Sequence, residues 1–352
     1  MATSEHQKMT QRRVAVLAGV SQATVSLVLN GKADALSRIP NDTRQRVLDV
    51  IRETTYVADP AARRLAGVGN KILGVFTYEP AFPTESLDFY TPLLTGIEAK
   101  AESIGCDLLL FTSAPVIDGR RRIFHENNRL GLADGCLLLG RDMDHEELAR
   151  LVANGFPFVA IGRRDVDGVP YVGVDYATGT AELARLAAEQ GHRRFYYLHV
   201  DSSAESVTDR QAGFLRELAT VPEVRFELRA STGDELDADW AAITAYGPSV
   251  LFVESPADAH TIYALATAAG LSIPADLSIV VLGEPSRGRD QAVDFTRLSP
   301  PRTELGSQAV TLLSRILSKT DAPTDAETRV LLDCPALVGS TLARPRIKGT
   351  TT

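Results

Sequence analysis

The spacing of the apolar residues along the chain changes at about residue 70. Up to that point, short stretches carry apolar residues three and four positions apart, which is the period of an amphipathic helix. They predict a helix over 11–18, a second that follows Ser21 and ends at Asn30-Gly31, and a third over about 42–54. The side chains expected to face a shared core are Val14, Leu17 and Ala18, then Val25, Val28 and Leu29, then Val47, Val50 and Ile51.

From residue 72, short apolar runs alternate with amphipathic stretches. The runs predict strands at 72–78, 107–111, 135–139, 158–161, 195–199, 250–253 and 278–282. The predicted helices include 93–103, 146–153, 178–190, 209–219 and 257–269. Strands of this length alternating with helices are typical of parallel sheets covered on both faces. About eleven strands are too many for one compact open sheet, so we expect two doubly wound α/β lobes.

Between these two parts, the segment Ala58-Asp-Pro-Ala-Ala-Arg-Arg-Leu-Ala-Gly67 predicts a helix of about two turns. Asp59 provides an N-cap, Pro60 suits the first helical position and Gly67 suits the stop. Because a helix this short is not stable alone, we expect it to order only when a partner holds it. The polar tail over 341–352 is expected to fray.

Length and composition are those of a globular protein of two or three domains. The 352 residues are 44% hydrophobic and 23% charged. No apolar run approaches the roughly 18 residues of a membrane helix, and the polar start lacks the apolar core of a signal peptide. Cys106, Cys136 and Cys334 lie in or beside apolar stretches, so we expect reduced thiols and a cytoplasmic location.

The net charge of −8 is unevenly distributed along the chain. The first 67 residues hold ten Lys and Arg against six Asp and Glu, whereas the remainder holds 27 against 39. A basic head on an acidic body suggests that only the head meets a polyanion. A basic excess of this size also arises by chance, so charge alone does not decide the function.

The run Arg13-Val-Ala-Val-Leu-Ala-Gly-Val-Ser-Gln-Ala-Thr-Val-Ser-Leu-Val-Leu-Asn-Gly31 has the pattern of a helix-turn-helix motif. Ala15 and Gly19 keep the two helices close, Val20 fills the turn, and Ser21 opens a recognition helix for the major groove. This run closely resembles the signature of the lactose-repressor/galactose-repressor (LacI/GalR) family of bacterial regulators. The resemblance covers almost the whole chain and continues through Thr43-Arg-Gln-Arg-Val, the segment ending at Gly67, Gly191-His-Arg-Arg-Phe, Asp209-Arg-Gln-Ala-Gly-Phe and Ala275-Asp-Leu-Ser-Ile.

The resemblance implies a set of DNA contacts. Gln22 and Ala23 take the positions that touch base edges from the start of the recognition helix. Leu65 matches a leucine that wedges into the minor groove from both subunits, with Ala62 packed beside it. The residues expected to hold phosphates or sugars without reading sequence are Ser21, Thr24, Ser26, Asn30 and Thr43.

The head departs from the family pattern at three places. Leu27, within the DNA-contacting set, stands where most members carry an arginine and removes a polar contact. Arg13 replaces the usual acidic residue of the first helix, and the loop over 32–38 is a few residues longer. The preferred operator sequence therefore does not follow from the resemblance.

The body resembles the fold of periplasmic sugar-binding proteins, in which two lobes are crossed by the chain three times and a ligand lies in the cleft. In such sheets, strand ends and helix N-termini converge on one crevice. Arg210 matches an arginine that clamps ligand hydroxyls or carboxylates, with an ion pair between the lobes or at the surface as the alternative. The other candidates for effector contact are Phe89 and Tyr90, whose alternative role is core packing, and the strand-end residues Tyr78, Asp175, Ser255 and Glu284.

Two polar anchors of the family's ligand site are altered in this chain. Ser255-Pro256 stands where members usually carry an Asn-Asp pair. Gly283-Glu284-Pro285 replaces the usual strand-end aspartates. The identity of the effector therefore cannot be carried over from a relative.

The motifs of common enzymes are missing from the sequence. It has no Gly-rich phosphate loop with its lysine, no Gly-x-Ser-x-Gly elbow and no histidines paired at metal spacing. His192 lies in a Gly-His-Arg-Arg turn, where we expect a structural role. We therefore expect no catalytic residues, no metal and no cofactor.

The predicted architecture is an all-α helix-turn-helix headpiece followed by an α/β core of two doubly wound lobes. The headpiece takes residues 1–57, a hinge 58–68, the core 69–345 and a tail 346–352. Within the core, the N-lobe takes about 69–174 and 299–328, and the C-lobe about 175–298 and 329–345. One headpiece buries too little surface for useful affinity, so we expect a homodimer on a pseudo-palindromic site, with a tetramer as the alternative.

The predicted function is that of a sequence-specific transcription regulator, most simply a repressor. Its affinity for double-stranded operator DNA would respond to a small-molecule effector such as a sugar, in the cytoplasm at the nucleoid and without a membrane partner. Two rival classes remain. One is a ligand-independent repressor or architectural protein with a degenerate cleft, and the other is a ligand-binding or enzymatic α/β protein with an incidental helical head. Whether effector releases or promotes DNA binding stays open.

Overall fold

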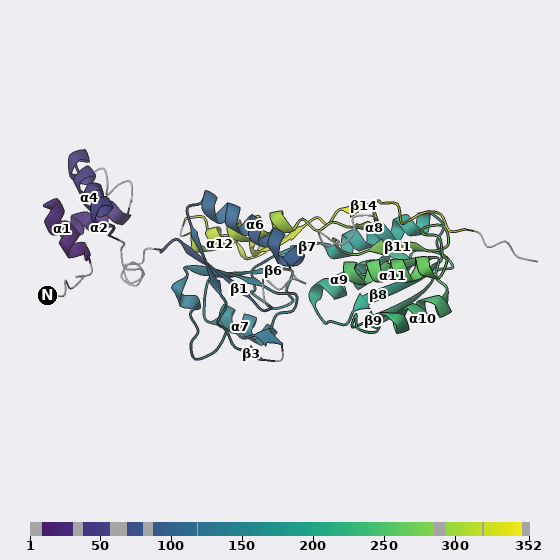
Figure 1. The fold of residues 1–352 in the computed structure, drawn as a ribbon. Coiled ribbons are helices and arrows are strands. Elements are labelled where there is room, and N and C mark those ends of the chain that lie inside the picture. Colours follow the sequence, from purple (N-terminus) through teal and green to yellow (C-terminus); the bar gives the residue numbers. More distant parts are fainter. Residues whose placement is uncertain are drawn as a thin grey trace, which may run out of the picture. The chain divides into compact units, whose positions relative to one another are not determined.

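The computed structural model describes residues 9–30, 38–56, 69–79, 87–117, 119–284, 293–318 and 320–346. The chain divides into two compact units, Met1–Lys71 and Ile72–Thr352, each with a core of its own (Figure 1). The hinge predicted at 58–68 lies outside the described residues. The roles predicted there for Ala62 and Leu65 stay predictions.

The described part of the first unit contains the helices α1 (Gln11–Ala18), α2 (Gln22–Asn30) and α4 (Asn41–Thr54), as predicted. Their shared core consists of Val14, Ala15, Ala18, Val25, Val28 and Val47. Leu17 was wrongly expected in this core, because its side chain is 55% exposed. Helix α1 turns Ala15 toward α2 and α4 instead, and that small side chain lets the short helices pack closely.

The N-lobe is built on a parallel sheet with the strand order β13-β7-β6-β5-β1-β2. Helix α7 (His145–Ala153) covers one face of this sheet, while α6 (Leu87–Ser103) and α12 (Arg302–Leu317) cover the other. Strands β5 and β6 are fully buried, which is why they appear in the sequence as unbroken apolar runs. The strand bounds are β1 (Ile72–Thr77), β2 (Asp107–Phe111), β5 (Gly135–Leu139), β6 (Phe158–Ile161), β7 (Tyr171–Val174) and β13 (Arg329–Leu332).

Short elements complete this lobe. The strands β3 (Val116–Ile117) and β4 (Arg120–Arg121) form a small antiparallel hairpin, and η1 (Leu130–Leu132) and η2 (Asp325–Thr328) are single 3-10 turns. The hairpin follows β2 and leads back to the cleft edge of the sheet, where Arg121 donates to the carbonyl oxygen of Glu79 at 3.2 Å. It therefore forms part of the rim of the cleft.

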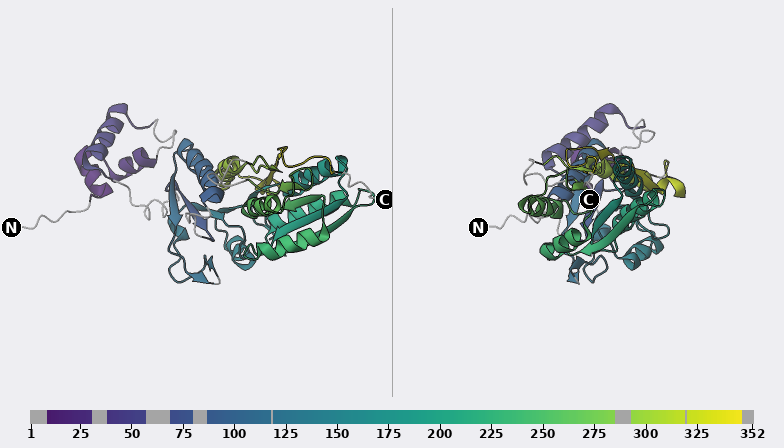
Figure 2. Two further views of the ribbon diagram at one scale, coloured as in Figure 1. Left: turned by 45° about the vertical axis from the view of Figure 1, so that its right-hand side comes forward. Right: turned by 90° about the vertical axis from the view of Figure 1, so that its right-hand side faces the viewer.

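The C-lobe repeats the design with the strand order β14-β12-β11-β10-β8-β9, in which only β14 runs antiparallel to its neighbour. Helices α8 (Tyr176–Glu189) and α9 (Glu205–Leu218) cover one face, and α10 (Leu236–Tyr246) and α11 (Pro256–Ala268) the other (Figure 2). The strand bounds are β8 (Arg194–Val200), β9 (Arg225–Ser231), β10 (Val250–Val253), β11 (Ser278–Val281), β12 (Thr296–Leu298) and β14 (Ala336–Leu337).

The chain passes between the lobes three times: after β7, after β12 and after β13. The boundary predicted after residue 328 was wrong, because residues 329–332 form β13 and pair with β7 in the N-lobe sheet. At that sheet edge the backbone of β13 gains hydrogen bonds to β7 on one side, and the last crossing follows it. The order of the crossings places α12 in the N-lobe and β14 in the C-lobe.

The last described segment is anchored, so the prediction that the tail frays from residue 341 was also wrong. Thr341 is buried, and its hydroxyl donates to the carbonyl oxygen of Ile279 at 2.6 Å. His192 lies 2.8 Å from the carbonyl oxygen of Ala343 through Nε2 and 2.9 Å from the Ser249 hydroxyl through Nδ1. This confirms the structural role predicted for His192.

Helices α6 and α12 approach each other backbone to backbone at two glycines. A β-carbon added to Gly96 would lie 1.9 Å from the carbonyl oxygen of Thr303, and one added to Gly306 would lie 2.2 Å from that of Leu93. Both distances are far below van der Waals contact, and the opposing atoms are backbone. The close packing of these two helices therefore requires glycine at both positions.

We expect Gly306→Ala to lower the free energy of unfolding by about 1–3 kcal/mol, because the methyl group must push α6 and α12 apart. Urea denaturation of the full chain measures the change. Glu98→Ala, on the exposed side of α6, provides the control and should leave the unfolding midpoint close to that of the wild type. A Gly306→Ala protein as stable as the wild type would contradict the packing described.

Candidate functional site

The first candidate site is the turn between α1 and α2. The two helices meet at 105°. Gly19 supplies the turn with a φ of 65°, and the Ser21 hydroxyl accepts the backbone N–H of Thr24 at 3.1 Å, which caps α2. A short turn, this crossing angle and a capped second helix are the features of a helix-turn-helix motif.

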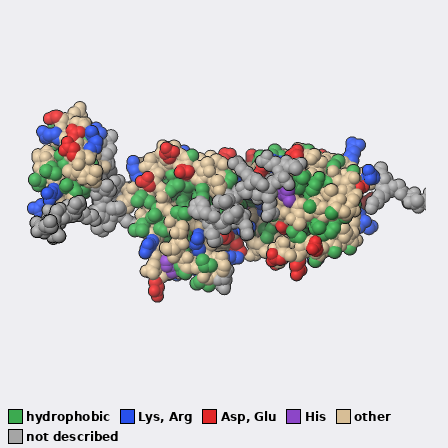
Figure 3. Space-filling view, in the orientation of Figure 1, with side chains coloured by type: hydrophobic (Ala, Val, Ile, Leu, Met, Phe, Trp, Pro, Cys, Tyr) green, Lys and Arg blue, Asp and Glu red, His purple; other side chains and the backbone are tan. Residues whose placement is uncertain are grey.

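Most residues predicted to contact DNA lie where a partner can reach them. Ser21, Gln22 and Ala23 are exposed at the start of α2, and Leu27 is 43% exposed one turn later. Thr24, Ser26 and Thr43 are half-buried, and Asn30 closes α2 with a side chain outside the described set. On the visible face of this unit, basic side chains lie among acidic ones (Figure 3).

Among the described helices, none is long and apolar enough to cross a membrane by itself. Only α1 and α2 taken together meet that test of length and composition, and their axes are bent by 105° at the break.

The second candidate site is a cleft of about 590 Å³ between the lobes of the body. It lies at the carboxyl ends of the strands of both sheets, where the loops after β5 and β6 face those after β8, β9, β10 and β11. This is the edge at which open parallel sheets bind ligands, and the volume is that of a small-molecule site. Of the predicted effector contacts, Phe89, Arg210 and Ser255 line the cleft.

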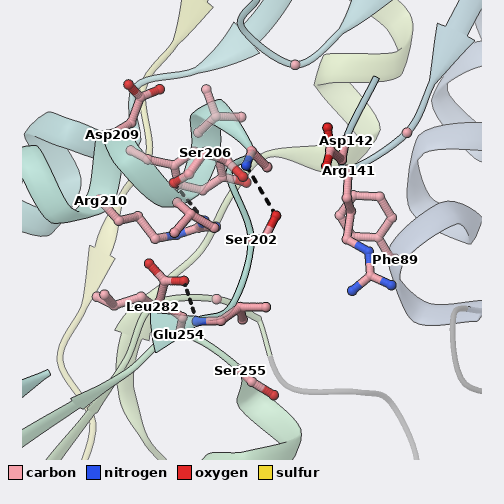
Figure 4. Close-up of a pocket in the computed structure, with 18 of the residues that line it drawn as sticks. Phe89, Arg141, Asp142, Ser202, Ser206, Asp209, Arg210, Glu254, Ser255 and Leu282 are labelled. Atoms are coloured by element: carbon pink, nitrogen blue, oxygen red, sulfur yellow. Dashed lines mark hydrogen bonds between the residues drawn. The ribbon is translucent and has the colours of Figure 1, made fainter. Parts of the chain in front are cut away.

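Arg210 extends from α9 into the cleft, on the side opposite Phe89 and Arg141 (Figure 4). Its guanidinium carbon lies 3.7 Å from the centre of the Tyr176 ring, and Nη1 donates to the carbonyl oxygen of Ser206 at 2.9 Å. Its Nε is buried without a hydrogen-bond partner. The cation–π stack and one bond hold the plane of the guanidinium, and Nε–H remains an unsatisfied donor.

Glu254 lies beside Arg210 and was missed by the sequence analysis (Figure 4). Its carboxylate is buried, accepting the hydroxyl of Tyr197 at 2.6 Å and the backbone N–H of Val200 at 3.1 Å. Burial, and then the negative charge of Glu254, raise the pKa of Tyr197 well above its usual value. Burial alone would lower the pKa of Arg210, but Tyr176, Glu254 and Tyr197 raise it, so the guanidinium stays charged.

Hydroxyl groups line the C-lobe side of the cleft. They come from the loop after β8, the first turn of α9, the loop after β9 and the start of α11, and belong to Ser202, Ser206, Ser231, Thr232 and Ser255. Asp258, in the first turn of α11, adds a further carboxylate, and burial raises its pKa. The sequence signal for these groups was present, since acidic and hydroxyl residues follow each buried strand, but it did not show which strand ends meet.

Four predicted effector contacts lie elsewhere. Tyr78 is fully buried in the N-lobe core, and Tyr90 is buried with its hydroxyl bonded to Glu79. Asp175 caps α8 by accepting the N–H of Thr178 at 2.9 Å. Glu284 pairs with Arg297 at 3.4 Å. None of the four is among the residues that line the cleft. Core packing holds the two tyrosines, helix capping holds Asp175, and an ion pair holds Glu284.

Within the described residues, no group of three or more His, Cys, Asp or Glu side chains is placed to hold a metal ion. The donors of the cleft are arginines and hydroxyls, and its acceptors are carboxylates and hydroxyls. This combination suits an organic ligand with many hydroxyl groups.

Comparison with known proteins agrees with both sites. The family model described as bacterial regulatory proteins, lacI family, matches residues 11–59, and the one for a periplasmic binding protein-like domain matches residues 184–340. The HTH-type transcriptional regulator CelR of Thermobifida fusca is 28% identical over 330 residues, which cover 89% of this chain and 94% of CelR.

Two solved structures share the fold. A complex of the transcriptional regulator CelR with cellobiose aligns with a TM-score of 0.62 and 24% identity, covering 95% of this chain and 99% of that one. The lac repressor dimer bound to operator and the anti-inducer ONPF aligns with a TM-score of 0.72 and 18% identity, covering 96% and 100%.

A helix-turn-helix unit joined to a two-lobed body like a periplasmic binding protein defines a DNA-binding transcription regulator. The chain belongs to the LacI family of bacterial regulatory proteins, as its motifs predicted. The relatives described above are transcription regulators rather than enzymes.

Proposed function

We propose that this regulator is a repressor whose affinity for its operator is set by a sugar, or a related polyhydroxylated metabolite, in the cleft. Membership of the LacI family supports the DNA-binding half of the proposal. The observation that carries the effector half is the charged Arg210 beside the buried Glu254, in a cleft lined with hydroxyl groups.

The chemistry of the cleft favours a sugar over an apolar ligand. A carboxylate accepts hydrogen bonds from hydroxyl groups, and a guanidinium donates hydrogen bonds to them. Neighbouring Arg and Glu side chains can therefore bind adjacent hydroxyl groups of a sugar. Phe89 offers a ring across the cleft from Arg210 that suits the apolar face of a pyranose. The cellobiose held by CelR in its solved complex is a ligand of this class.

A ligand-independent repressor is the second candidate, and Ser255 and Gly283 favour it. Both line the cleft at positions where the family resemblance implies polar anchors. In the structure, however, Ser255 caps α11 by accepting the N–H of Asp258 at 3.3 Å, and Glu254 and Asp258 supply carboxylates within the same cleft. These acidic residues thus replace the polar groups that the family resemblance implies at Ser255 and Gly283. This supports a cleft that still binds a ligand, with a preference different from that of the relatives.

The assembly and location are part of the proposal. The lac repressor aligned above is a dimer on operator DNA, and two helix-turn-helix units are needed to read a pseudo-palindrome. We therefore propose a homodimer in the cytoplasm, bound at the nucleoid, with a tetramer as the alternative. The proposed DNA contacts are the exposed start of α2 together with Thr43, Ala62 and Leu65.

Selection of binding sites from random double-stranded DNA by the full chain tests the DNA-binding half. We expect two half-sites in inverted order, and Gln22→Ala should weaken binding to the selected site by about 1–3 kcal/mol by removing a base contact. Gln45→Ala, on an exposed face of α4, is the matched control and should bind as the wild type does. Enrichment of no defined sequence would overturn the assignment.

Calorimetry with cellobiose, sucrose, maltose and glucose tests the effector half. We expect at least one of these sugars to bind, and Arg210→Ala to weaken that binding by about tenfold or more, since a charge-assisted hydrogen bond is lost. Arg216→Ala, on an exposed face of the same helix, should bind the sugar unchanged. Binding of none of the four by the wild type would favour the ligand-independent alternative, and full affinity in Arg210→Ala would show that Arg210 is not the clamp.

A further inference from the structure

Two consecutive arginines in the loop after β6 reach from the N-lobe to α9 of the C-lobe. Arg164 donates through Nη1 to Glu205 Oε2 at 2.7 Å, and Arg163 donates through Nε to Asp209 Oδ2 at 2.7 Å. Glu205 and Asp209 are one helical turn apart in α9, so both acids face the same loop. We call these four residues the interlobe latch.

The Arg164–Glu205 pair is the buried part of the latch, with both side chains at most 6% exposed. Arg164 also donates through Nη2 to the carbonyl oxygen of Gly140 at 2.8 Å, which fixes its guanidinium to the N-lobe. Glu205 Oε1 lies 3.3 Å from Nε2 of His145 and accepts the backbone N–H of Asp165 at 3.3 Å, both N-lobe groups. The first residue of α9 is thus bound almost entirely by the other lobe.

The Arg163–Asp209 pair is the outer part of the latch, with both side chains about one-fifth exposed. Arg163 also bonds to Asp165 of its own loop, which orients the guanidinium toward α9. Asp209 directly precedes Arg210, the residue proposed to clamp the ligand. The same helical turn therefore carries the side chain tied to the N-lobe and the proposed clamp, and both residues line the cleft (Figure 4).

The latch is ionic in this arrangement. Burial alone would raise the pKa of Glu205, but Arg164 and the backbone N–H groups lower it below the usual value, so the carboxylate stays charged. A buried ion pair adds little to stability over apolar residues of the same shape, yet removing one partner is costly. The contacts of this pair are made only where the loop after β6 meets the start of α9, so they are specific to the lobe arrangement that brings these two segments together.

We propose that the interlobe latch selects the arrangement of the two lobes seen in this structure and so fixes the width of the cleft that Arg210 lines. The proposal rests on the proposed function in one respect: a ligand in the cleft would act on the lobe arrangement that the latch selects. When both ion pairs are removed by substitution, the three crossing segments and the apolar core still join the lobes, and a second, more open arrangement becomes populated.

The test is a distance measurement between the lobes by pulsed electron paramagnetic resonance on the full chain, without added ligand. Spin labels are placed at Ala149→Cys in α7 and Ala241→Cys in α10, both exposed, and labelled protein is diluted with unlabelled protein so that each measured pair lies within one chain. Cys106 is replaced by serine. Cys136 and Cys334 are buried, which raises the pKa of each thiol and protects it from labelling.

The wild type should give one narrow distribution of distances, and Arg164→Met with Glu205→Gln should add a longer population. Asp209→Asn, which removes only the outer pair, should broaden the distribution and keeps the test decisive where the double variant fails to fold. The matched control is Arg185→Met with Glu189→Gln, an exposed pair within α8 at 3.9 Å, which should match the wild type. A wild-type distribution in the latch variants would overturn the proposal. The measurement does not require sugar binding. It therefore tests the latch proposal separately from the proposal that a sugar is the effector.

Discussion

The cleft depends on one constraint, which is that the parallel strands of both lobes end at the same crevice. In the N-lobe the loops after β5 and β6 reach it, and in the C-lobe those after β8, β9, β10 and β11 do. Residues that are distant in sequence, such as Arg164, Arg210 and Glu254, therefore meet in a small volume. Because α9 begins at this crevice, its first two turns carry both the contacts between the lobes and the proposed ligand clamp.

That arrangement gathers charges in a place where solvation is reduced, and the structure shows how each is compensated. Glu254 is held by a tyrosine hydroxyl and a backbone N–H, and Arg164 by a carboxylate and backbone carbonyls. Compensation is incomplete at both arginines, because the Nε atoms of Arg164 and Arg210 are each buried without a hydrogen-bond partner. A buried donor left unsatisfied is costly, so this network of charges is maintained at some expense of stability.

Much of the fold follows from local features of the sequence. The helices of the first unit and the seven strands predicted from apolar runs lie within a residue or two of their predicted bounds, because caps, turn glycines and apolar runs are local signals. The buried strand β7 was not predicted. The exposure of Leu17 and the pairing of β13 with β7 depend on which neighbour packs where. The same holds for the cleft. Arg210 was predicted through a family motif, whereas the place of Glu254 depends on β10 ending beside α9. The prediction that Tyr78 and Tyr90 contact the effector was wrong, because both side chains are buried in the N-lobe.

The central claim is that occupancy of the cleft changes the affinity of the same chain for its operator. The most direct test is a fluorescence anisotropy titration of the selected DNA site with full-length protein, once with the cleft empty and once with it saturated by a sugar that binds in calorimetry. Linkage requires the two affinities to differ, and typical coupling free energies of about 1–3 kcal/mol correspond to a change of about five- to 150-fold. Equal operator affinities with an empty and a saturated cleft would contradict the account.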